Sequence, residues 1–154
     1  MSDRQTQREP ITIYTIGFTG HSAEEFFTKL QNAGVKTLVD VRLNNVSQLA
    51  GFAKRRDLEY FLCTICDIDY IHEKILAPTK DILDDYKKKR ITWEQYELRF
   101  NKLLAERRPD VELSPSELNG GCLLCSEHEH IHCHRRLVTD FLQSKWGDVE
   151  VVNL

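Results

Sequence analysis

The sequence has no long hydrophobic run and no excess of basic charge, and both absences narrow the classes of protein that fit it. No stretch approaches the roughly 20 apolar residues that a membrane-spanning helix needs, and the polar first ten residues contain no apolar signal core. We therefore expect a cytoplasmic protein with no part in a membrane. The net charge of -3 argues against a generic electrostatic grip on nucleic acid, although it leaves room for a local basic patch.

The sequence has five cysteines. Because this number is odd, a disulfide framework in which every cysteine is paired is excluded. Reduced thiols are expected in the cytosol. Two C-x-x-C spacings occur, Cys63/Cys66 and Cys122/Cys125, and paired spacings of this kind are common in structural zinc sites. Both pairs lie within regular apolar patterns, however. We expect Cys63 on the buried face of a helix and Cys122 in a buried strand, without a four-cysteine zinc site.

The length of 154 residues and the balance of 41% hydrophobic to 29% charged residues suit one globular domain with a sizeable core. We expect residues 1–10 to form a flexible N-terminal tail and residues 11–154 to form a single α/β domain. The sequence shows no internal repeat and no low-complexity segment. A second domain is not expected.

Runs of β-branched and apolar residues alternate with helical patterns along the chain. Strands are predicted at residues 11–16, 36–41, 68–72, 122–126 and 149–152. Helices are predicted at 22–32, 57–66, within 78–108 with a break at 90–92, and at about 133–145. Residues 109–121 are predicted to form a surface loop. This alternation predicts a three-layer α/β fold, with a mostly parallel, Rossmann-like sheet of about five strands and helices on both faces.

Two features resemble nucleic-acid-binding elements, and we interpret both otherwise. The basic run at residues 87–90 is most simply a solvated helix end, where cations also suit the helix dipole. Trp93, Tyr96 and Phe100 recur at helical spacing, so we expect them in the core and not in a base-stacking platform. Nucleic acid is therefore only a weakly supported partner.

The segment from Cys125 to Arg136 is the part of the chain richest in reactive side chains. It follows an apolar strand and precedes an amphipathic helix, so Cys133, His134 and Arg135 should lie near a helix start. The first turn of a helix has unpaired N–H groups and a partial positive charge, which favour anions and thiolates. We expect Cys133 to have a lowered pKa there and Arg135 to offer a planar fork to an anion.

Polar residues follow each of the first four predicted strands at the same end of the strand. They are Gly17 and His21 after the first, Asp40 and Arg42 after the second, His72 after the third, and the segment from Cys125 after the fourth. In parallel α/β sheets, ligands bind outside the carboxyl ends of the strands. The sequence therefore predicts a polar site at this edge.

Seven segments resemble, in order and spacing, the domain-of-unknown-function family numbered 488. They are TIGFTGHS, LVDVR, GFAK, IDYIH, LAPT, ITWEQYELRF and LLCSEHEHIHCHR, and they extend from Ile11 to about Leu142. The resemblance implies an α/β domain but no known reaction. It also implies a set of motif residues, which are Gly17, Asp40, Arg42, Cys125, Glu127, Cys133, His134 and Arg135.

The first functional hypothesis is an enzyme that acts on a phosphate-bearing substrate, such as a nucleotide or nucleic acid. The catalytic candidates are Asp40, Glu127, Cys133 and His134. The substrate-binding candidates are Gly17, His21, Arg42, His72 and Arg135. In this hypothesis His134 is the general acid or base, Asp40 orients it and Cys133 is the nucleophile. The alternative for Asp40 and Arg42 is a structural salt bridge between the strand end and the loop.

A second hypothesis is a zinc site, because mixed cysteine and histidine ligands on a short loop suit Zn²⁺. Its candidate ligands are Cys125, Cys133, His128 and His134. A third is a non-catalytic module that binds a small anion or a partner. An unusually reactive Cys133 would favour catalysis, and an inert one would favour packing or binding. A Cys125/Cys133 dithiol switch ranks last, because eight steps along the chain do not guarantee the required proximity.

Overall fold

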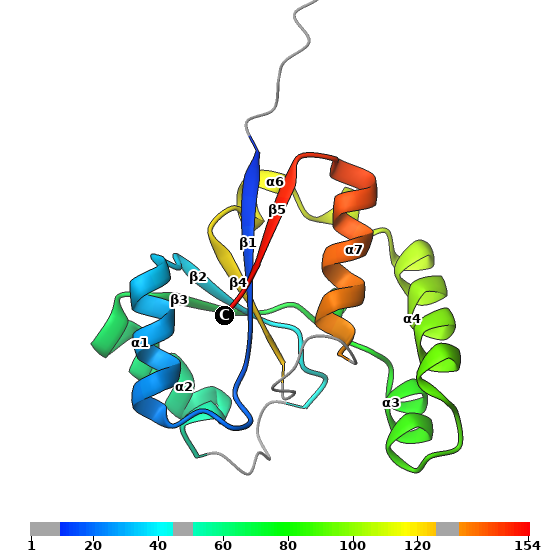
Figure 1. Ribbon diagram of the computed structural model, residues 1–154, viewed down its shortest axis with the longest axis horizontal. Coiled ribbons are helices and arrows are strands. Elements are labelled where there is room, and N and C mark those ends of the chain that lie inside the picture. Colours follow the sequence, from blue (N-terminus) through cyan, green and yellow to red (C-terminus); the bar gives the residue numbers. More distant parts are fainter. Residues whose placement is uncertain (1–9, 45–50, 126–132) are drawn as a thin grey trace, which may run out of the picture.

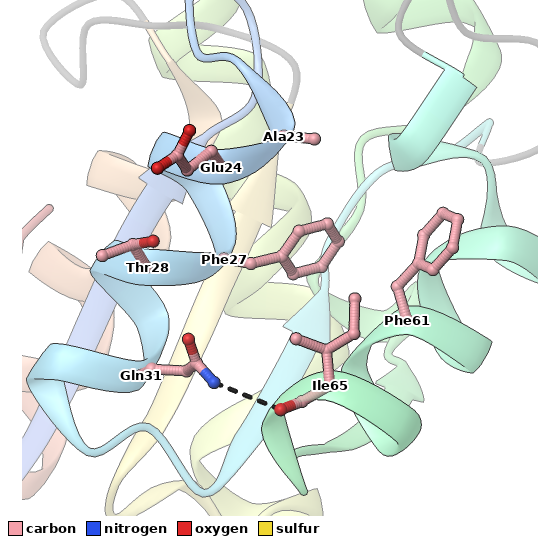
Figure 2. A pocket seen from close by; sticks show the side chains of 7 residues that line it. All are labelled: Ala23, Glu24, Phe27, Thr28, Gln31, Phe61 and Ile65. Atoms are coloured by element: carbon pink, nitrogen blue, oxygen red, sulfur yellow. Dashed lines mark hydrogen bonds between the residues drawn. The ribbon is translucent and has the colours of Figure 1, made fainter.

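The structure is a computed structural model that describes residues 10–44, 51–125 and 133–154 (Figure 1). Its centre is a five-stranded sheet in the order β3-β2-β4-β1-β5, in which every paired strand runs parallel to its neighbour. The strands are β1 (Ile11–Gly17), β2 (Thr37–Asp40), β3 (Asp69–His72), β4 (Gly121–Cys125) and β5 (Val149–Asn153). The predicted parallel sheet is confirmed.

Helices cover both faces of this sheet, which makes the fold a three-layer α/β fold. In Figure 1, α1 and α2 lie on one side of the strands, and α3, α4 and α7 lie on the other. The helices are α1 (Ala23–Ala33), α2 (Arg55–Phe61), α3 (Lys80–Lys87), α4 (Trp93–Arg107), α5 (Pro109–Glu112), α6 (Pro115–Leu118) and α7 (His134–Trp146). Short helical turns add η1 (Gly51–Ala53), η2 (Leu62–Cys66) and η3 (Lys74–Leu76).

The helix boundaries follow from local capping chemistry. The Ser22 hydroxyl accepts the Glu25 backbone N–H at the start of α1, and Gly34 ends that helix in the left-handed conformation with φ 74°. Thr92 and Gln95 form a capping box that starts α4. The break predicted between α3 and α4 is confirmed.

The sheet separates two hydrophobic cores. On the α4 and α7 side, Trp93, Tyr96 and Phe100 are buried, which confirms them as core residues. On the α1 and α2 side, Phe26 and Leu30 pack with the buried residues of β2 and β4. Both faces of the sheet are therefore covered, as expected for strands with nearly continuous apolar sequences.

Three local predictions need correction. The second helix is not one α-helix over 57–66, because α2 begins at Arg55 and passes into the π-helical turn η2. Cys63 is exposed and not buried, because Leu62 faces the core and the next residue along a helix points to a different side. The expected surface loop at 109–121 contains α5 and α6 and ends in the first residue of β4.

The strand order places a topological switch point at β4. β4 lies between β2 and β1, and its connection leads to α7 on one face, while β1 leads to α1 on the other (Figure 1). Connections that leave neighbouring strands toward opposite faces open a crevice at the carboxyl ends of those strands. None of the helices in the described ranges is both long and apolar enough to span a membrane.

Candidate functional site

The centre of the carboxyl edge is a buried ion pair between Asp40 and Arg42. Asp40 is the last residue of β2 and is fully buried. Its two carboxylate oxygens accept Nε and Nη2 of Arg42, each over 2.8 Å, and Oδ1 also accepts the Arg42 backbone N–H over 3.1 Å. Arg42 is itself only 3% exposed. The bidentate geometry fixes the plane of the guanidinium.

Two residues that sequence reasoning missed complete this arrangement. The Tyr70 hydroxyl donates to Oδ2 of Asp40, and the Arg42 guanidinium lies 5.5 Å from the centre of the Phe18 ring. A signal for Tyr70 was present, because it lies two residues before His72 on the neighbouring strand and so projects from the same face. Phe18 directly follows Gly17, but nothing in the sequence indicated that β1 ends beside Arg42.

Two histidines bind backbone carbonyls at the end of β2. His72 Nε2 donates to the Arg42 carbonyl over 2.7 Å, and His134 Nε2 donates to the Val41 carbonyl over 2.8 Å. Burial lowers the pKa of His134 to about 4, and the charge of Arg135 adds to this effect. The bond to Val41 and the charge of Asp40 oppose it. His134 is therefore neutral at pH 7 and cannot donate a proton there as an imidazolium.

Cys125 and Cys133 lie in contact on the α7 side of the edge. Cys125 ends β4, Cys133 is the N-cap of α7, and their Sγ atoms are 2.6 Å apart. Burial raises the pKa of Cys133 well above its ordinary value, and the hydrogen bond to Cys125 adds to the rise. The Arg135 backbone N–H and side-chain charge act against it. The lowered pKa expected at the helix start is thus wrong, because burial outweighs the helix end.

Gly17 and Arg135 also lie at this edge. Gly17 is in register with Cys125 in the β1–β4 pair. Arg135 is in the first turn of α7 and is 3% exposed. Its charge acts on both Cys133 and His134, so it lies near both of these side chains.

Other predicted site residues are held elsewhere or lie outside the described residues. His21 is bound through Nε2 to Lys29 Nζ over 3.0 Å and packs against Phe26, and both of these contacts connect it to α1. Glu127 and His128 fall in residues 126–132, outside the described residues, as do residues 1–9 of the tail predicted at 1–10.

The zinc hypothesis finds no support within the described ranges. No cluster of three or more histidine, cysteine, aspartate or glutamate residues there is arranged to hold a metal ion. Of the four candidate ligands, His134 already uses Nε2 for the Val41 carbonyl, and His128 is not described. Cys63 is exposed and Cys122 is buried, so the two C-x-x-C pairs belong to different environments.

Two buried arginines, Arg42 and Arg135, give this edge its positive charge. The ion pair orients Arg42, and a second arginine is buried near the same helix start. The two groups proposed for proton transfer and nucleophilic attack are in their neutral forms at pH 7, because burial lowers the pKa of His134 and raises that of Cys133.

Comparisons with known proteins assign the chain to a family. Neither the curated proteins nor the solved structures gave a match to the chain. The family model described as domain of unknown function DUF488 matches residues 22–142, a range that includes β2, β3, β4 and most of α7. This match confirms the resemblance found in the sequence motifs. The chain therefore belongs to the DUF488 family.

Proposed function

We propose that this protein binds a phosphate-bearing ligand at the carboxyl edge of its sheet, with Arg42 as the principal anion-binding residue. One observation carries the proposal. Nη1 of Arg42 is buried and has no hydrogen-bond acceptor among the residues that the structure describes. A buried donor without an acceptor costs about 1 to 3 kcal/mol, and more when it is charged. A phosphate oxygen would supply the acceptor.

The rest of the arrangement supports the same ligand chemistry. Asp40 occupies Nε and Nη2 of Arg42 and holds the guanidinium rigid, so Nη1 is presented without further loss of side-chain entropy. Arg135 adds a second buried positive charge near the N-terminus of α7, where helix N–H groups favour anions. The position matches the switch point at which α/β sheets bind ligands.

Binding is better supported than turnover. Asp40 accepts hydrogen bonds from three groups and so serves as an orienting group more than as a free base. His134 is neutral and Cys133 is protonated at pH 7. An enzyme that acts on the bound phosphate ester stays a prediction, and the same samples test it by product analysis.

The test is isothermal titration calorimetry, with inorganic phosphate, pyrophosphate, AMP and ATP as probes. Arg42→Lys keeps the positive charge and removes the planar guanidinium. We expect the affinity for the best probe to fall about 10- to 100-fold, which corresponds to the loss of one charge-assisted hydrogen bond. The matched control is Arg107→Lys. Arg107 is half-buried, and its Nη1 donates to the backbone carbonyls of Lys74, Ile75 and Ala77.

Equal affinity in the wild type and Arg42→Lys, or no binding of any probe, would refute the proposal. If Arg42→Lys does not fold, the arginine side-chain NMR signals of the wild type decide instead. Addition of the probe should shift the Arg42 guanidinium signals and leave those of Arg107 in place. Chromatography of the incubated probes separates binding from turnover.

A further inference from the structure

Two thiols from different elements are in direct contact beside the proposed anion site. Cys125 lies at the end of β4 and Cys133 lies immediately before α7, and both belong to the core on the α4 and α7 side of the sheet. They are eight residues apart in the sequence. Packing of a strand against a helix therefore sets their positions, so the proximity does not depend on a local turn.

The distance between the sulfur atoms discriminates between two chemistries. The Sγ atoms are 2.6 Å apart. In a disulfide they would be about 2.05 Å apart. Two thiolates that bind one tetrahedral zinc ion at about 2.3 Å would lie roughly 3.8 Å apart. The observed separation is therefore nearer to that of a disulfide than to that of a pair of zinc ligands.

We propose that Cys125 and Cys133 form a redox-active dithiol that a small peroxide oxidises to an intramolecular disulfide and that a thiol reductant restores. In the first step one thiolate attacks a peroxide oxygen, the O–O bond breaks, and a sulfenic acid forms as hydroxide leaves. In the second step the other sulfur attacks the sulfenic sulfur, the S–S bond forms, and its proton leaves with the hydroxyl group as water. Two thiols lose two electrons, and one peroxide is reduced to two waters.

Burial decides which oxidant fits. Cys125 is 1% exposed and Cys133 is 2% exposed, so a bulky disulfide cannot align with either sulfur, whereas hydrogen peroxide is little larger than water. Burial and the bond to Cys125 raise the pKa of Cys133, which keeps that sulfur in the thiol form at pH 7. The inference does not depend on Arg42 or on ligand binding.

The test uses the full chain with Cys63→Ser and Cys66→Ser, because the exposed Cys63 would otherwise compete for the oxidant. The folded protein is treated with hydrogen peroxide, unfolded, and alkylated with N-ethylmaleimide. We expect two fewer alkylated thiols than in the untreated protein and, before alkylation, a mass lower by about 2 Da, both reversed by dithiothreitol. Cleavage after Glu127 and Glu129 separates Cys125 from Cys133 in the sequence, so a linked peptide pair identifies the bond.

Cys122→Ser is the matched control, since Cys122 is equally buried in the same strand and belongs to the opposite core. This variant should still form the disulfide, whereas Cys125→Ser and Cys133→Ser should not. Peptide mapping of the protein that retains all three thiols decides the question if either variant fails to fold. The proposal is overturned if all three thiols stay alkylatable under conditions that oxidise the unfolded chain, or if the bond includes Cys122.

Discussion

At the scale of single residues, burial determines the chemistry of the site more than the position of each residue in the sequence. Cys133 and His134 lie at the helix start that the sequence predicts, yet burial raises the pKa of the first and lowers that of the second. Burial favours the neutral form of any ionisable group. The helix end and Arg135 act in the direction expected for the thiol but contribute less than burial.

His134 should make stability depend on pH below neutrality. Its pKa is about 4 in the folded protein, against an ordinary value of 6.5, so the unfolded chain takes up the proton first as the pH falls. The stability present at pH 7 is therefore lost between about pH 6.5 and pH 4. We expect His134 to account for about 2 kcal/mol of lost unfolding free energy between pH 7 and pH 5.

Urea unfolding of the wild type and His134→Gln at both pH values measures this loss. Glutamine keeps a side-chain N–H that can reach the Val41 carbonyl, but it does not titrate. The variant should lose less stability than the wild type on acidification. Between pH 7 and pH 8 the free energies of unfolding of the two proteins should change with pH by the same amount. Equal losses in both proteins would show that His134 is not held neutral.

At the scale of secondary-structure elements, local capping chemistry is the reliable part of the sequence pattern. The predicted start and end of the first helix and the predicted break at 90–92 lie at the caps Ser22, Gly34 and Thr92, because caps depend on contacts within a few residues. The change from α2 to the π-helical turn η2 was not predicted, since it depends on how Leu58 and Leu62 reach the core. The prediction that Cys63 is buried was wrong for the same reason, because it assumed one continuous α-helical period.

Alanine substitutions at Gly34 and Gly51 test whether the backbone conformation at a helix end contributes to stability. A Cβ added at either position would meet no atom within 4 Å, but only Gly34 has a positive φ, of 74°. We expect Gly34→Ala to lower the free energy of unfolding by about 1 to 2 kcal/mol, because the left-handed conformation is unfavourable for alanine. Gly51→Ala, the matched control, should change it by less than about 1 kcal/mol, and in the stabilising direction. Chemical denaturation measures both, and similar losses would contradict the argument.

At the scale of the whole molecule, the two cores share one sheet. Buried residues of β4 alternate between them, with Leu123 and Cys125 on one side and Cys122 and Leu124 on the other. A perturbation on one face should therefore be transmitted to the other through the strands. The single domain expected from the sequence remains a prediction that unfolding experiments can test.

Phe26→Ala provides this test, because Phe26 is fully buried in the α1 core while both tryptophans, Trp93 and Trp146, belong to the opposite core. We expect Phe26→Ala to lower the free energy of unfolding by about 3 to 5 kcal/mol. If the chain unfolds as one unit, tryptophan fluorescence and far-UV circular dichroism should report the same shifted midpoint. Leu98→Ala, at a 72% exposed position, is the control and should change little. Separate midpoints would mean that the two cores unfold independently.

The sequence by itself determined the order of strands and helices, the edge at which polar residues gather and the family. These depend on local hydrophobic period, on caps and on motif order, all of which are written along the chain. Only the tertiary structure decided the contact between Cys125 and Cys133, the position of Tyr70 and Phe18 on the Asp40–Arg42 pair, and the neutral state of His134. The physical reason is that distance and burial arise when separate elements pack, and no local pattern specifies either of them.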